Sequence, residues 1–218
     1  MATIIEHYKK AKENLVYHLI DSTGLLFEST PAYAAMETSR WVGMPDDISM
    51  NARLIAAGLT YVGGMGIAYS KGRDFYRKTF GITAKAKEIV QAPNDAVYNG
   101  LFNLVGGPFI YLIAGSRNLN EIAMGTALGI VLGIVNGFPL GYSADVFRDL
   151  AGLKECERPL YPKFLKRQNS KIKKGLAALL VASSIALTAG IYALTPDKQT
   201  INYQQQTIQQ VIDTGNSH

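Results

Sequence analysis

The chain has 218 residues, a formal net charge of +5, 48% hydrophobic residues and a single cysteine. The lone Cys156 excludes an intrachain disulfide, and the scattered histidines (His7, His18 and His218) form neither a metal-ligand set nor a catalytic grouping. The sequence therefore predicts no enzyme, no cofactor and no metal site.

Four long stretches contain no charged residue: 54–70, 96–116, 122–142 and 175–196. Three of them have the roughly 20 residues that a transmembrane helix needs, and the first reaches that length if Arg53 and Lys71 at its ends snorkel to the membrane surface. A water-soluble protein rarely carries several such stretches. We therefore predict an all-α, multi-pass membrane protein in a lipid bilayer.

Residues 1–14 are expected to form a short amphipathic lead-in, and residues 15–36 the first membrane span. This span contains Asp21 and Glu28, whose spacing places both carboxyls on one helical face. A carboxyl in a low dielectric is driven towards its neutral form, so Asp21 and Glu28 are the candidates for proton coupling. The alternatives are that these carboxyls are paired within the bundle, or that the helix lies in the membrane interface.

The other elements follow in order. Residues 37–52 are expected to be a loop in which Trp41 anchors the interface, and 71–94 and 146–174 to be basic segments. The later spans are predicted at 53–70, 95–116, 121–142 and 175–196. This gives a four-helix core over 15–150, a basic segment over 151–174, a fifth helix and a polar, Gln-rich tail over 197–218.

Lysine and arginine are distributed unevenly between the two sides of these spans. Residues 1–14, 71–94 and 146–174 carry most of them, whereas the opposite side receives only Arg40, Arg53, Arg117 and Lys198. By the positive-inside rule this places the N-terminus in the cytoplasm and the C-terminus outside a plasma or inner membrane. The rule already accounts for the basic segments, so nucleic acid is not an expected partner.

Glycine recurs every four residues along the fourth span. Such a stripe lets another helix backbone approach closely in a membrane, so we predict a helix-packing face, within the chain or between copies in a homo-oligomer. Its members are Gly125, Gly129, Gly133, Gly137 and Gly141.

The two halves of the core resemble each other. Leu26-Phe27-Glu28 is similar to Leu101-Phe102-Asn103, and each half ends with Tyr-Ser followed by a charged and aromatic segment, after Tyr69 and after Tyr142. We interpret them as parallel two-helix repeats, an arrangement in which transporters keep the substrate site between repeats. The alternative is chance similarity between apolar helices.

Four motifs together resemble those of the small L-alanine exporter family. They are an Asp-led first helix at Asp21, an Arg-Asp pair after the second helix at Arg73-Asp74, the Gly-Pro-Phe-Ile-Tyr of the third helix with Pro108 and Tyr111, and a Gly-rich fourth helix. The resemblance covers residues 15–150 and implies four spans and export of alanine driven by the proton gradient. This chain departs from the family in its fifth span, its tail and the mid-helix Glu28.

Polar residues inside the third and fourth spans are the candidate ligands of a small zwitterion: Tyr98, Asn99, Asn103 and Asn136. Interhelical hydrogen bonding is the alternative role for the three amides. Charged residues near the cytoplasmic boundary are candidates for a gate, or else for ion pairs that fix the topology: Arg73, Asp74, Asp145 and Arg148.

Two functions remain at this point. The first is proton-coupled export of small neutral amino acids such as L-alanine, and the second is a non-transporting subunit whose Gly-rich spans pack in a larger membrane assembly. The in-span carboxyls and amides favour the transporter. The fifth helix and the Gln-rich tail motivate the structural subunit.

Overall fold

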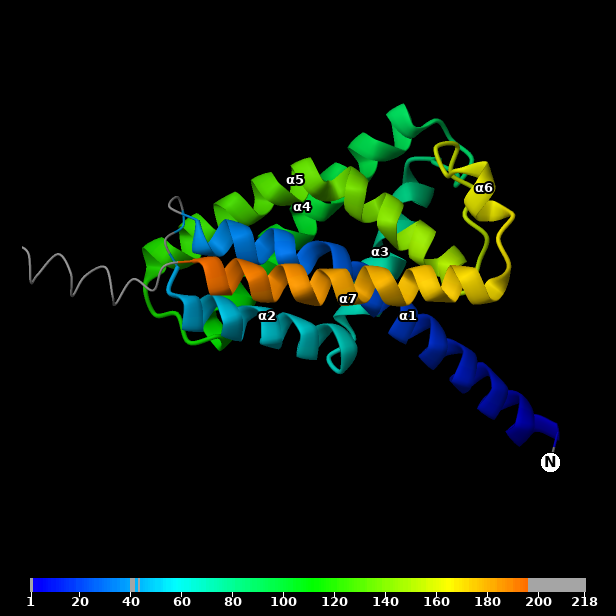
Figure 1. Ribbon diagram of the computed structural model, residues 1–218, viewed down its shortest axis with the longest axis horizontal. Helices are drawn as coiled ribbons and strands as arrows, with labels where there is room; N and C mark the ends of the chain where they lie inside the picture. Colours follow the sequence, from blue (N-terminus) through cyan, green and yellow to red (C-terminus); the bar gives the residue numbers. More distant parts are fainter. Residues whose placement is uncertain (1, 40–41, 43, 196–218) are drawn as a thin grey trace, which may run out of the picture.

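A computed structural model describes residues 2–39, 42 and 44–195 (Figure 1). Within these residues the fold is all-α, as predicted from the sequence. Its seven helices are α1 (Ala2–Thr38), α2 (Asp46–Tyr61), α3 (Met65–Thr79), α4 (Glu88–Ile113), α5 (Leu119–Leu150), α6 (Lys163–Lys166) and α7 (Ser170–Leu194). Trp41 and the tail 197–218, for which the sequence suggested an anchor and a flexible segment, lie outside the described residues.

The long helices run up and down along one axis, with α1 in contact with α2, α3, α5 and α7. One end of the bundle, here called the α6 end, holds α6, the start of α1 and the turns from α3 to α4 and from α5 to α7 (Figure 1). The end of α1, the start of α2 and the end of α7 lie at the opposite end (Figure 1). This course brings all three sequence segments that are rich in lysine and arginine to the α6 end.

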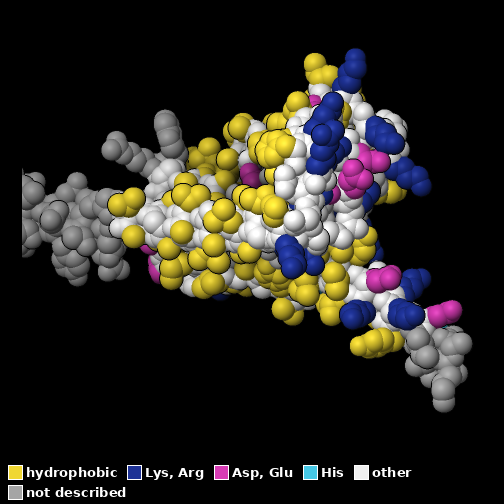
Figure 2. Space-filling model, turned by 45° about the vertical axis from the view of Figure 1, so that its right-hand side comes forward, with side chains coloured by type: hydrophobic (Ala, Val, Ile, Leu, Met, Phe, Trp, Pro, Cys, Tyr) yellow, Lys and Arg dark blue, Asp and Glu magenta, His cyan; other side chains and the backbone are white. Residues whose placement is uncertain are grey.

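In the part of the chain that the structure describes, three helices are long and apolar enough to cross a membrane: α4, α5 and α7. Large hydrophobic side chains remain exposed on them, including Val105 (66% exposed), Val135 (72%) and Ile185 (66%). Figure 2 shows hydrophobic side chains along the flank of the bundle and Lys and Arg side chains at the α6 end. Contiguous apolar surface of this kind is a liability in water but matches a lipid environment.

Helix α1 is continuous from Ala2, so the expected lead-in 1–14 is its first part rather than a separate element. Three polar residues of α1 from its middle onwards are buried against neighbouring helices: His18 is 9% exposed, and Ser22 and Glu37 are 0% exposed. These side chains lower the mean hydropathy of α1 without facing the surroundings of the bundle.

The predicted second span, 53–70, is wrong as a single helix. α2 ends at Tyr61 and α3 starts at Met65, because Gly64 adopts φ 76°, a left-handed conformation that glycine reaches without steric cost. The end of α2 is capped from α1: His18 donates from Nε2 to the Tyr61 carbonyl (2.7 Å) and Ser22 donates to the Thr60 carbonyl (3.2 Å).

Other boundaries also differ from the expected ones. Much of the predicted basic segment 71–94 is helical, since α3 continues to Thr79 and α4 begins at Glu88. α5 continues to Leu150, about two turns beyond its uncharged part, because the polar groups there are paired within the protein. The first charged residues after an apolar stretch therefore do not mark the end of the helix, because its backbone hydrogen bonds continue beyond them.

The glycine ladder of α5 is buried, and most of it faces α4. A Cβ atom at Gly137 would lie 2.2 Å from Ala96 Cα, and one at Gly141 would lie 2.2 Å from Asp95 Oδ2. Gly129 instead faces Tyr33 of α1. The glycine face of α5 therefore packs against α4 and α1 of the same chain.

Candidate functional site

A small cavity lies in the middle of the bundle, where α1, α2, α3, α4 and α5 meet. Its volume is about 70 Å³, well above the roughly 10–15 Å³ that a cavity needs to hold one water, so it has room for a few waters or a small solute. Apolar side chains such as Leu25 and Leu140 form part of its wall. We call this space the central cavity.

Two of the predicted ligands, Asn99 and Asn103, line the central cavity, but their amides are engaged with the protein. Asn99 donates to the Gly133 carbonyl (2.9 Å) and Asn103 donates to the Asn99 carbonyl (2.8 Å). The Tyr33 hydroxyl donates to Asn103 Oδ1. These bonds hold α4 close to α5 and α1, which is the interhelical role that the sequence left open.

Three other polar atoms of the cavity wall are buried without a hydrogen-bond partner among the described residues: Tyr69 Oη, Thr126 Oγ1 and Arg53 Nε. Tyr69 is 1% exposed and Thr126 is 9% exposed. A buried polar group without a partner costs about 1–3 kcal/mol, so a ligand that bonds to it recovers that free energy. The sequence analysis singled out none of these three as ligands, because nothing local in the sequence shows which polar groups remain unpaired after packing.

The remaining predicted ligands, Tyr98 and Asn136, are not among the residues that line the cavity. The Tyr98 hydroxyl donates to the Tyr69 carbonyl (2.9 Å), which ties α4 to α3. Asn136 lies beside Glu28. Glu28 Oε2 and Asn136 Nδ2 are both buried and have no hydrogen-bond partner among the described residues.

The two predicted proton-coupling residues both face α5, at different levels. Asp21 accepts two hydrogen bonds from the guanidinium of Arg148, at 2.6 Å and 2.8 Å. Glu28 lies about two turns further along α1, next to Asn136. Asp21 is thus locked in a bidentate ion pair, whereas one oxygen of Glu28 has no partner.

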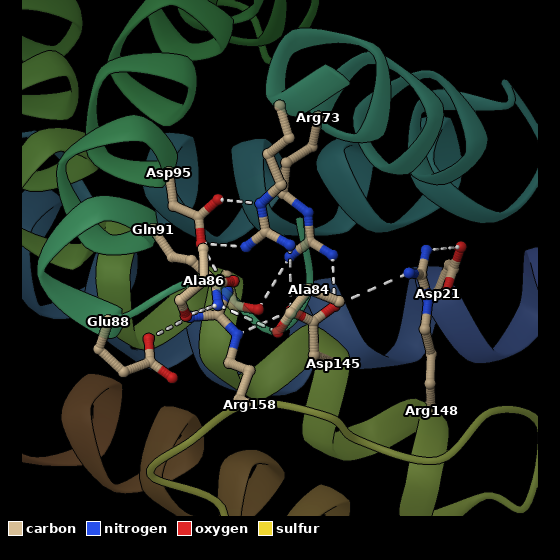
Figure 3. A network of polar contacts seen from close by, with 12 residues as sticks. Asp21, Arg73, Ala84, Ala86, Glu88, Gln91, Asp95, Asp145, Arg148 and Arg158 are labelled. Atoms are coloured by element: carbon tan, nitrogen blue, oxygen red, sulfur yellow. Dashed lines mark hydrogen bonds and ion pairs between the residues drawn. The ribbon is translucent and has the colours of Figure 1, made fainter. Parts of the chain in front are cut away.

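A dense ionic network closes the bundle at the α6 end (Figure 3). Arg73 donates to Asp145 (2.7 Å) and to the Gly141 carbonyl (2.8 Å). Arg77 donates to Asp95 Oδ1 (2.8 Å) and also bridges to Asp145 (3.3 Å). We call this network the arginine cluster, and its members are Arg73, Arg77, Arg158, Glu88, Asp95 and Asp145.

Arg158, in the segment after α5, completes the arginine cluster. Its guanidinium donates to Asp95 (2.6 Å), Asp145 (2.8 Å) and Glu88 (2.9 Å), and the residue is 1% exposed (Figure 3). Burial alone would lower the pKa of Arg158, but the carboxylates of Asp145 and Asp95 raise it above its ordinary value. The six side chains carry equal positive and negative charge.

Of the predicted gate residues, Arg73 and Asp145 belong to the arginine cluster and Arg148 lies beside it, 3.8 Å from Asp145. Asp74 is exposed on α3. The sequence analysis missed Arg77, Arg158 and Glu88, and residue 95 entered it only as the first position of a predicted span. Asp95 lies 47 residues before Tyr142, much as Asp21 lies 48 residues before Tyr69, and this spacing was the available signal for Asp95.

A second buried polar group lies at the opposite end, and the sequence analysis missed it. Glu37, which is 0% exposed, accepts hydrogen bonds from Arg53, from Tyr111 (2.9 Å) and from Ser49 (2.8 Å). The hydroxyl of Tyr192 in α7 bonds to Ser49 (2.9 Å). The expectation that Arg53 snorkels is wrong, because its side chain is 12% exposed and is paired with Glu37. We call these five residues the Glu37 cluster.

A scan against protein-family models, a search of curated proteins and a search of solved structures each found no match to this chain. The resemblance to L-alanine exporters therefore stays a prediction from the sequence. Among the described residues, no group of three or more His, Cys, Asp or Glu side chains could hold a metal ion.

Proposed function

We propose that the chain is a multi-pass membrane transporter that carries a small polar solute through the central cavity. One observation supports this most directly: the wall of the central cavity carries buried polar atoms without a partner among the described residues, and an ionic cluster lies towards each end of the bundle. A solute that enters from either side has to pass one cluster while the other stays closed. This is the minimum arrangement for alternating access.

We further propose five membrane crossings. α4, α5 and α7 qualify by length and hydropathy, and α1 and the α2–α3 pair are the other two. Several polar side chains of α1 and α2 are buried against other helices, among them Ser22, Glu37 and Thr60, which is how polar residues are tolerated in a membrane span. The N-terminus would be cytoplasmic and the end of α7 outside, since the basic segments gather at the α6 end.

The pattern of buried residues supports two parallel repeats, α1 with α2–α3 and α4 with α5. On α2 the buried positions Ala52, Ala56 and Thr60 have the same spacing as Gly125, Gly129 and Gly133 on α5. Each of these α2 positions corresponds to an α5 position 73 residues later in the chain. Beyond the break, each buried α3 position corresponds to a buried α5 position 71 residues later, from Gly137 to Arg148. The buried positions of α3 are Gly66, Tyr69, Ser70, Arg73 and Arg77.

Ion pairs cross between these repeats in a reciprocal way. Asp21 in the first repeat pairs with Arg148 at the end of the second, and Asp95 in the second pairs with Arg77 at the end of the first. Each repeat thus supplies an acid on its first helix and a base on its second. Such an exchange is what two repeats related by a two-fold axis would produce, and it supports a substrate site between the repeats, where transporters built from repeats bind their substrates.

The substrate class that we propose is small neutral amino acids such as L-alanine, exported in exchange for protons. The size of the cavity and the resemblance of residues 15–150 to the exporter family support it. Of the two carboxyls, Glu28 is the better candidate for the coupling residue, because Asp21 is held by Arg148. The glycine ladder is covered by α4 and α1, so the structural-subunit hypothesis lacks the free packing face on which it relied.

Counterflow of labelled L-alanine in proteoliposomes, with and without an imposed pH gradient, tests the proposal. Wild-type protein is expected to move L-alanine faster under the gradient, and Glu28→Gln to lose that dependence because it cannot ionise. Glu13→Gln is the matched control, since Glu13 is an exposed carboxyl on the same helix. If correctly inserted wild-type protein moves neither L-alanine nor other small neutral amino acids, the proposal fails.

A further inference from the structure

The wall of the central cavity contains one charged side chain among the residues that the structure describes, Arg53 of α2. Its guanidinium carbon lies 5.0 Å from the centre of the Tyr33 ring, and Tyr33 also lines the cavity. Arg53 Nε is buried, and no described residue forms a hydrogen bond with it. The Arg53 guanidinium therefore borders the cavity and carries an N–H group, at Nε, that is available to a ligand.

Arg53 is occupied on its other side by a carboxylate of the protein itself. Its Nη2 donates to Glu37 Oε1. The Glu37 carboxylate does not depend on Arg53 alone, because Tyr111 and Ser49 also donate to it, at 2.9 Å and 2.8 Å. If Arg53 turned towards the cavity, Glu37 would keep two of its hydrogen bonds.

We infer that Arg53 is the anchor for a carboxylate group of the transported solute, and that Glu37 holds this anchor while the cavity is empty. The inference rests on the proposed function and assigns its substrate class: small solutes that carry a carboxylate. A guanidinium presents a planar fork of N–H donors that matches a carboxylate in two parallel hydrogen bonds. The Glu37 and solute carboxylates compete for that fork.

The rest of the solute would face the other polar atoms of the cavity. Tyr69 Oη and Thr126 Oγ1 are buried, unpaired and on the cavity wall, and both can accept a hydrogen bond from an ammonium group. Occupation of Arg53 also has a consequence for the bundle. The Arg53–Glu37 pair joins α1 to α2 at the opposite end, so a solute that takes Arg53 weakens that closure from within.

The test compares three ligands that differ in charged groups: L-alanine, propionate (no ammonium) and L-alaninamide (no carboxylate). Binding to the full-length protein in detergent is measured by calorimetry, and uptake is measured in proteoliposomes. For wild-type protein, L-alaninamide is expected to bind at least about tenfold more weakly than L-alanine, since a charge-assisted pair is lost. Propionate should bind measurably, because it keeps the group that Arg53 recognises.

Two variants separate the anchor from its internal competitor. Glu37→Gln removes the competing charge, so L-alanine and propionate should bind about tenfold more tightly, with less change for L-alaninamide. The double variant Glu37→Gln with Arg53→Gln removes both charges of this ion pair together, so neither is left without the other, and it is expected to fold. It should bind L-alanine and L-alaninamide equally.

The outcomes distinguish this inference from the proposed function. If wild-type protein transports L-alanine and the folded double variant still prefers it to L-alaninamide, Arg53 is not the anchor, although transport stands. If Glu37→Gln leaves carboxylate binding unchanged, Glu37 does not compete for Arg53 and the inference fails in that part. If wild-type protein transports and binds none of the solutes, the proposed function fails and the inference fails with it.

Discussion

At Gly137 the backbones of α5 and α4 meet with no room for a side chain. A Cβ atom there would lie 2.2 Å from Ala96 Cα and 2.8 Å from the Asp95 carbonyl oxygen, and neither backbone atom can rotate away. We expect Gly137→Ala to reduce the free energy of unfolding by about 1–3 kcal/mol through overpacking. Gly190→Ala is the matched control: Gly190 lies in α7 with nothing within 4 Å of an added Cβ, so it should be neutral or stabilising by about 1 kcal/mol. Equal thermal unfolding of the two variants in detergent would contradict the ladder contact.

The ion pair between Asp21 and Arg148 is the second contact whose strength can be measured at the residue scale. Both side chains are 10% exposed, so removal of one leaves a largely buried charge. We expect Asp21→Asn to cost about 3–5 kcal/mol and the double variant Asp21→Asn with Arg148→Gln to cost less than the sum of the single variants. Denaturant titration of the four proteins in detergent measures the coupling. Additive effects would show that this pair does not join α1 to α5.

The break at Val62–Gly64 is the main departure from symmetry at the scale of whole elements. The buried positions on α2 and α3 match buried positions on α5, but the sequence offset between matching positions falls from 73 residues for α2 to 71 residues for α3. Deletion of Gly63 and Gly64 should therefore fuse α2 and α3 into a helix with one continuous buried face, as in α5. Deletion of Gly64 alone would rotate α3 by about 100° and turn Arg73 and Arg77 away from their partners.

We expect the two-residue deletion to give a folded protein without transport, because the freed carbonyls that α1 caps would return to helical hydrogen bonds. The one-residue deletion should lower expression and thermal stability. Size-exclusion profiles, unfolding temperatures and L-alanine counterflow of both proteins check this. Full transport by the fused helix would mean that the break has no part in the mechanism.

The all-α fold and the approximate positions of the helices could be predicted from the sequence, because they depend on local composition and spacing. The glycine ladder is an example: spacing alone placed Gly125 to Gly141 on one face, and that face is buried. The partners of Arg53 and Arg158 could not be predicted in this way. Arg53 of α2 pairs with Glu37 of α1, and Arg158 reaches Asp95 from a segment without regular structure. Such contacts depend on how helices are juxtaposed, which one sequence does not reveal.

At the scale of the whole molecule, charge and hydrophobicity are sorted along the long axis. The buried ionic clusters lie towards the two ends, the exposed lysine and arginine side chains gather at the α6 end, and exposed apolar side chains cover the length between (Figures 1 and 2). A bilayer around the apolar length would leave the α6 end in water. We predict that this end lies in the cytoplasm, because cytoplasmic loops of membrane proteins carry the excess of Lys and Arg.

Cysteine labelling in intact cells tests this orientation. Thr83 lies exposed between α3 and α4 at the α6 end, and Asn120 lies exposed at the start of α5 at the opposite end. A membrane-impermeant maleimide should label Asn120→Cys in intact cells, but Thr83→Cys only after the membrane is permeabilised. The native Cys156 should remain unlabelled in both cases, since it is 2% exposed and burial raises the pKa of its thiol. Labelling of Thr83→Cys in intact cells, with Asn120→Cys protected, would invert the orientation and place the arginine cluster on the outside.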